Sequence, residues 1–145
     1  MKKYLLLLYL PLALLFACNT DATETADVKA TLETQVLAIH DTAMEKMGDI
    51  IKLRRQLRSL HDTLQTQQAD STDLLVLQQE INSLNKADEE MMQWMRQYEA
   101  PDSLQHTEAM TYLQQELVKI ERVQTLMDST IQAAHITAQK YEQPK

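Results

Sequence analysis

The stretch from Leu32 to Leu64 reads LETQVLAIHDTAMEKMGDIIKLRRQLRSLHDTL, and it decides the fold. Apolar residues recur in it at alternating steps of four and three, which is the spacing of a heptad repeat. Nine of its ten seam positions are apolar, and the tenth is Lys46. The seam consists of Leu32, Val36, Ile39, Ala43, Lys46, Ile50, Leu53, Leu57, Leu60 and Leu64. This spacing predicts one amphipathic helix over residues 28–68.

Two further seams follow in the chain. The second consists of Leu74, Leu77, Ile81, Leu84, Asp88, Met91, Met95 and Tyr98. The third consists of Met110, Leu113, Leu117, Ile120, Gln124, Met127, Ile131, Ala134, Ala138 and Tyr141. N-cap side chains precede both, in Asp70-Ser71-Thr72-Asp73 and at Asp102, so we expect helices over 72–99 and 103–141. Because short turns make neighbouring helices antiparallel, residues 28–145 are predicted to form an all-α, three-helix antiparallel bundle.

The composition excludes several other classes of protein. Gly48 is the only glycine, and turns of sheets and phosphate-binding loops both require glycine. Without Lys2 and Lys3 the chain has 12 basic and 21 acidic residues, so its charge is 12 − 21 = −9. A chain this acidic repels nucleic acid, and we expect no binding to DNA or RNA.

The N-terminus has the organisation of an export signal. Lys2 and Lys3 precede a mainly apolar run from Tyr4 to Phe16, and Ala17 and Cys18 follow. The apolar run is about 13 residues long, whereas a membrane-spanning helix needs about 20. Residues 1–17 are therefore predicted to be a cleaved signal peptide.

Cys18 is the only cysteine, so an intramolecular disulfide cannot form. Leu15-Phe16-Ala17-Cys18 resembles the lipobox of bacterial lipoproteins, which implies that Cys18 is lipidated and anchors the protein to a membrane. Residues 18–27 are polar and acidic, and we expect a flexible tether there. Asn19 stands where an aspartate would resemble an inner-membrane retention signal, which favours the outer membrane of the cell envelope.

The charges predict one structural ion pair. Folding the first hairpin about residue 71 places Arg54 and Arg55 opposite Asp88. Because Asp88 occupies a seam position, a buried carboxylate there would be costly without a cation. We expect Arg54 or Arg55 to pair with Asp88 and to fix the register of the hairpin.

Folding about residues 71 and 101 also gathers histidines and methionines at one height. The candidate ligands are His40, Met44, Met47, Met91, Met95, His106 and Met110. Imidazole and thioether groups suit Cu(I), so one hypothesis is a periplasmic copper-binding protein. The other is that these side chains fill the core or form an adaptable partner surface, with no cofactor. A helical wheel turns Met44 about 130° from the first seam, toward solvent, which favours the second hypothesis.

Motifs of catalysis are not found in the sequence. No histidine has a glutamate three residues before it, and the zinc-protease pattern His-Glu-x-x-His does not occur. His61 adjoins Asp62, but adjacent residues of a helix point about 100° apart and form no dyad. We therefore predict a non-enzymatic binding or structural protein, with an unidentified envelope protein as partner or self-association through its helices.

Three stretches carry a resemblance to a known family. They are residues 40–47 (HDTAMEKM), 52–57 (KLRRQL) and 87–95 (ADEEMMQWM). Together they resemble a family of short helical lipoproteins from Gram-negative bacteria that are labelled, through coiled-coil similarity, viral A-type inclusion proteins. The resemblance covers about residues 36–135, and it implies an exported lipoprotein without catalytic residues.

Overall fold

The computed structural model describes residues 20–142, with side chains from residue 26 onward. Four helices make up this part of the chain: α1 (Thr20–Glu45), α2 (Met47–Thr66), α3 (Ser71–Gln97) and α4 (His106–Glu142). No strand occurs within it, which confirms the all-α prediction. The predicted signal peptide and Cys18 lie outside the described residues. No helix between residues 20 and 142 is long and apolar enough to cross a membrane.

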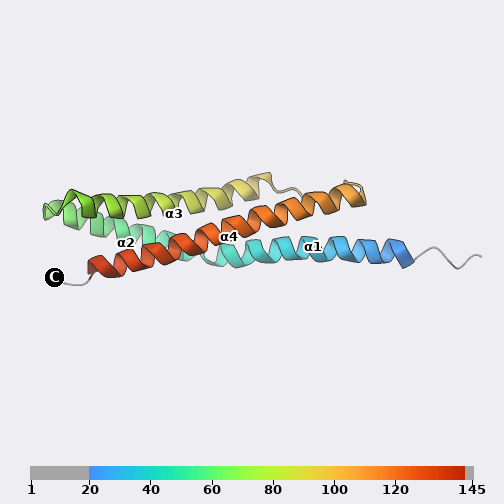
Figure 1. The fold of residues 1–145 in the computed structure, drawn as a ribbon, viewed down its shortest axis with the longest axis horizontal. Coiled ribbons are helices and arrows are strands. Elements are labelled where there is room, and N and C mark those ends of the chain that lie inside the picture. The colour runs from blue at the N-terminus through green and yellow to red at the C-terminus, as the bar shows by residue number, and fades with distance from the viewer. Residues whose placement is uncertain (1–19, 143–145) are drawn as a thin grey trace, which may run out of the picture.

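The helices form an elongated bundle of three rods. In Figure 1, α1 and α2 follow one another along the first rod, α3 runs back beside α2, and α4 returns in the direction of α1. Neighbouring rods in the chain are therefore antiparallel, as the short turns predicted. α4 packs against each of the other three helices and forms the centre of the bundle.

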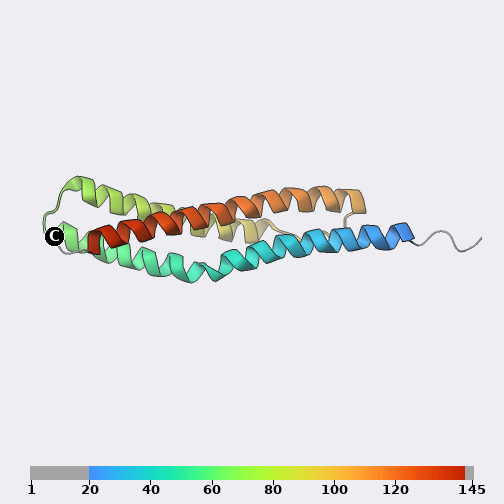
Figure 2. The same cartoon turned by 60° about the horizontal axis from the view of Figure 1, so that its bottom comes forward.

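The first rod differs from the single helix predicted over residues 28–68. Residues 20–27, expected as a tether, form the first turns of α1, since extending an existing helix costs far less than nucleating one. The rod is also interrupted at Lys46, and Figure 2 shows α2 leaving the line of α1 there. The Lys46 N–H donates to the Ala43 carbonyl three residues back, at 3.0 Å, which tightens the turn.

The polar seam residue explains why the rod bends at this point. Lys46 cannot remain in an apolar seam, and its ammonium group pairs with Asp128 of α4. Gly48 follows two residues later and weakens the helix locally. Nothing lies within 4 Å of where a Cβ on Gly48 would stand, so close packing does not explain the glycine.

The turn between α2 and α3 ends one helix and begins the next without glycine. Gln68 adopts a left-handed φ of 56°, and the Ala69 N–H donates to the Leu64 carbonyl at 3.0 Å, as in a Schellman motif. Asp70 then caps α3 by accepting from the Thr72 N–H at 2.7 Å. This hydrogen bond lowers the pKa of Asp70. The predicted cap of the second helix is thus present.

The connection between α3 and α4 is longer than predicted. α3 ends at Gln97 and α4 begins at His106, whereas the expected boundaries were 99 and 103. Asp102 does not cap α4, and its carboxylate lies 3.8 Å from the ammonium of Lys29 on α1. Residues 101–104 form turns instead, with the Leu104 N–H directed at the Pro101 carbonyl at 3.4 Å.

The bundle is closed at one end and open at the other. α2, α3 and α4 pack against one another at the closed end. At the open end α1 packs along α4, while every Cα atom of α1 lies more than 8 Å from those of α3. In both Figure 1 and Figure 2, α1 and α4 extend past the end of α3. The open end therefore has two helices where the closed end has three.

Candidate functional site

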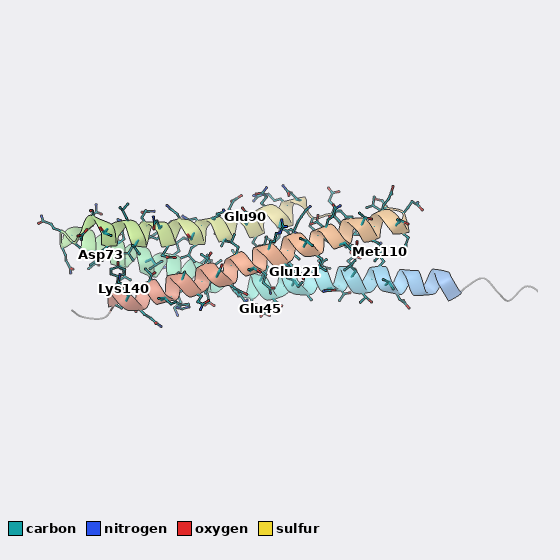
Figure 3. The ribbon with its side chains drawn as sticks, viewed as in Figure 1. Glu45, Asp73, Glu90, Met110, Glu121 and Lys140 are labelled. Atoms are coloured by element: carbon teal, nitrogen blue, oxygen red, sulfur yellow. The ribbon has the colours of Figure 1, made fainter. Side chains whose placement is uncertain are left out.

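A groove between α1 and α4 lies at the open end of the bundle. Its volume is about 570 Å³, and it is lined by these two helices alone. The lining residues are Asp27, Val28, Thr31 and Leu32, with Gln35, Met110, Gln114 and Leu117. We call this the α1–α4 groove. Figure 3 labels Met110 on α4 at this end of the bundle.

The chemistry of the α1–α4 groove is apolar with uncharged polar edges. Val28 is 50% exposed, and Leu32, Met110 and Leu117 are half-buried. Thr31, Gln35 and Gln114 contribute hydroxyl and amide groups, and Asp27 is the single charged residue of the lining. Depletion of charge around an apolar floor is typical of the central part of protein interfaces. An enzyme site would instead gather titratable groups.

An aromatic cluster bridges the gap between α1 and α3. The His40 ring of α1 lies 5.3 Å from the Trp94 ring of α3, centroid to centroid. Trp94 stacks on Tyr98 at 4.9 Å, and Tyr98 lies 6.2 Å from Tyr112 of α4. The side-chain rings thus make contact between α1 and α3, whose backbones lie too far apart to pack directly. The cluster therefore links α1 to α3 through side chains, in addition to the packing of α1 along α4.

Two polar atoms of this cluster are buried without partners. Nothing in residues 26–142 forms a hydrogen bond with Trp94 Nε1 or with the Tyr98 hydroxyl. Burial, followed by the negative charge of Glu33, raises the pKa of Tyr98 to about 12. The Glu33 carboxylate raises this pKa both through its charge and as a nearby acceptor, although the contact falls outside strict hydrogen-bond geometry. Tyr98 consequently stays protonated at neutral pH.

A carboxylate that the seams did not predict lies at the interface of α4. Glu116 is only 3% exposed, and its Oε1 accepts from the Lys119 ammonium at 2.6 Å. The side chain of Lys119 itself is 55% exposed, so water screens this pair from one side. The seam pattern did not predict that Glu116 is buried, because the predicted seam runs through its neighbour Leu117.

The structure pairs Asp88 with one of its two candidate arginines. Arg54 Nη1 donates to Asp88 Oδ2 at 2.9 Å and to the side-chain oxygen of Asn85 at 3.0 Å. The Arg54 and Asp88 side chains are 20% and 25% exposed, whereas Arg55 is exposed to solvent. The pair therefore links α2 to α3 within the closed end.

We expect Arg54→Met to lower the free energy of unfolding by about 1–2 kcal/mol, because it leaves the half-buried Asp88 carboxylate without its cation. Asp88→Leu should cost less, since Arg54 can still donate to Asn85. Adding Asp88→Leu to Arg54→Met should recover part of the loss. Urea unfolding of the three variants measures this, and equal losses below about 0.5 kcal/mol would show that the pair is solvated.

The predicted histidine and methionine layer is divided between two places. Met44, Met47, Met91 and Met95 all belong to or pack against the main core. The expectation that Met44 points mostly to solvent is wrong, because the buried face of α1 is centred on Val36 and Ala43 rather than on the full seam. His40 Nδ1 lies 2.9 Å from Asp41 Oδ1, and its ring packs on Trp94.

The other two candidate ligands lie elsewhere. His106 is the exposed first residue of α4, and Met110 lines the α1–α4 groove beside Leu32. Leu32 is about 18 Å from Met44 along α1, at 1.5 Å per residue. The longer connection before α4 accounts for this displacement. Among residues 26–142, no three His, Asp or Glu side chains lie close enough together to hold a metal ion.

Comparisons with protein-family models, with curated proteins and with solved structures found no match to this chain. The function must therefore be inferred from its own residues.

Proposed function

We propose that this chain is a lipid-anchored, non-enzymatic binding protein of the bacterial cell envelope. The α1–α4 groove carries the binding part of the proposal, because it exposes an apolar floor at an end of the bundle that lacks a third helix. Exposed apolar patches with polar edges commonly mark protein interaction sites. The export signal and the lipobox-like residues before Cys18 support the anchor.

The anchor and the groove would lie close together. Cys18 precedes Thr20, the first residue of α1, by two positions. Asp27 at the start of the groove is about 10 Å along α1 from Thr20, and the end of α2 is about 70 Å along the rod, at 1.5 Å per residue. A protein anchored through Cys18 would thus hold the groove near the membrane surface and extend its closed end away from it.

We expect Cys18→Ser, produced behind a signal peptide of the kind that is cleaved without lipidation, to leave the membrane, because serine cannot receive the thioether-linked diacylglycerol and no uncleaved signal remains to hold the chain. Fractionation of cells producing either form measures the share in the membrane pellet before and after a high-salt wash. Asn19→Ser is the matched control and should remain in the pellet. A Cys18→Ser variant that is processed and pelleted like the unaltered protein would rule out lipidation as the anchor.

A further inference from the structure

The segments of α1 and α4 that flank the α1–α4 groove have an excess of negative charge. Residues 20–45 and 106–121 together contain nine carboxylates and two lysines, so their balance is 2 − 9 = −7. α2, at the closed end, contains four basic and two acidic residues, a balance of 4 − 2 = +2. Residues 67–105 contain eight carboxylates and two basic residues, 2 − 8 = −6, so the groove lies between acidic segments in a chain whose basic residues are concentrated in α2.

Both lysines of these segments are already paired. The Lys29 ammonium is directed away from the groove lining: it donates to the Pro101 carbonyl at 3.2 Å and lies 3.8 Å from the Asp102 carboxylate. Lys119 is bound to the buried Glu116. Neither cation lines the groove, whereas Asp27 does. Glu121 lies one helical turn beyond Leu117, in a separate hollow that Arg122 also lines. Figure 3 labels Glu121 on α4 and Glu45 on α1.

The shape and the charge together specify an occupant. A floor formed by Val28, Leu32, Met110 and Leu117 between two helices accepts the apolar stripe of a third helix, as in other helix-in-groove complexes. The exposed carboxylate of Asp27 in the lining, together with the acidic balance of the flanking segments, favours cationic residues beside that stripe. We infer that the α1–α4 groove binds a cationic amphipathic helix of a partner protein, with leucine-like residues on one face and Lys or Arg on either side.

A second copy of this chain is the less favourable occupant. Two copies meeting through this groove would oppose two surfaces with the same excess of carboxylates, and like charges in contact are repulsive. A cationic partner helix is attracted by the carboxylates that would repel a second copy. The inference rests on the proposed binding role but is independent of the lipid anchor.

The test uses the whole chain from Asn19 to Lys145, which contains all four helices and lacks only the acylated cysteine. The probe is a fluorescein-labelled helical peptide of leucine and lysine with leucines at i, i+3, i+4 and i+7, and its binding is measured by fluorescence anisotropy. We expect saturable binding that weakens as salt is raised, because exposed charges are screened. A peptide with glutamate in place of each lysine should bind at least about tenfold more weakly.

Variants locate the binding. Val28→Gln with Met110→Gln keeps the charge but removes apolar floor, and should weaken binding of the leucine–lysine peptide by about tenfold or more. Leu75→Gln with Ile136→Gln removes two exposed apolar side chains elsewhere and should leave binding unchanged. Circular dichroism confirms that each variant remains helical, as expected from the partial exposure of the replaced residues.

Three outcomes would overturn the inference. The first is that the leucine–lysine peptide does not bind. The second is that it binds the variant Val28→Gln with Met110→Gln as tightly as the unaltered chain, which would mean that the interaction is general charge attraction. Alternatively, sedimentation shows a dimer that strengthens with added salt and is lost in the groove variant, which assigns the groove to a second copy. Failure of the proposed anchor would appear separately, as retention of Cys18→Ser in the membrane pellet.

Discussion

Trp94→Ala is expected to lower the free energy of unfolding by about 3–5 kcal/mol, the range for removing a large aromatic side chain from a core. Trp94 is 6% exposed and packs between His40 of α1 and Tyr98, the residue that follows α3. Because the backbones of α1 and α3 stay more than 8 Å apart, the truncated side chain would leave a space between them that these two helices do not fill by direct packing. Urea unfolding monitored by circular dichroism measures the loss.

The matched control is Trp94→Phe, which keeps a ring against His40 and removes the unpaired Nε1 donor. It should cost clearly less than the alanine variant. Native-state hydrogen exchange adds a second readout, since loss of the bridge should speed exchange in α1 more than in α2. A cost for Trp94→Ala below about 1 kcal/mol, with α1 exchange unchanged, would show that the aromatic cluster does not hold the open end together.

The heptad spacing predicted the fold because the apolar period is set locally, within each helix. Ile50, Leu53 and Leu57 of the first seam are all buried, and so are Leu77, Ile81, Leu84 and Met91 of the second. Lys46, the one polar residue of the first seam, was also informative, because the first rod bends there. Asp88 was placed on the second seam, but Ala87 beside it is the fully buried residue, which leaves the carboxylate at the edge where Arg54 reaches it.

The third seam was predicted less well because α4 has more than one neighbour. Leu113, Ile120 and Met127 are buried as expected, but Glu116, Val123 and Thr130 are buried in place of the half-buried Leu117, Gln124 and Ile131. A seam with strict steps of four and three describes contact with one partner helix. The fully buried residues of α4 keep these steps but include the neighbouring row 116, 123 and 130. With the half-buried row 117, 124 and 131 they form a broader buried face, because α4 packs on α1, α2 and α3.

The relative heights of the helices depend on the connections, and those are hard to derive from sequence. A turn centred on residue 101 would place Met110 beside Met92, whereas the observed connection of residues 98–105 runs on past the end of α3 before α4 begins, as Figure 1 shows. This longer connection separates His106 and Met110 from the other methionines. It also lets α1 and α4 extend past α3, which creates the α1–α4 groove.

The aromatic cluster had a weaker signal that sequence analysis could have used. Trp94 and Tyr98 are spaced i, i+4, which places large rings on one face of α3. Their contact with His40 could not be derived, because it depends on the bend at Lys46 and on the separation of α1 from α3. Sites that depend on the arrangement of whole helices are therefore accessible only from the structure.

Leu57→Ala is expected to destabilise the closed end by about 2–5 kcal/mol, as for other buried leucines cut back to alanine. Leu57 is 0% exposed on α2, which packs against both α3 and α4. In contrast to Trp94→Ala, the loss should affect hydrogen exchange in α2, α3 and α4 together, because the three helices share one core there. Ile51→Ala, at a 46% exposed position of the same helix, is the control and should cost under about 1 kcal/mol. If Leu57→Ala instead speeds exchange in α1 as much as in α2, the two ends unfold as one cooperative unit, and the division into a closed core and a separately held open end is wrong.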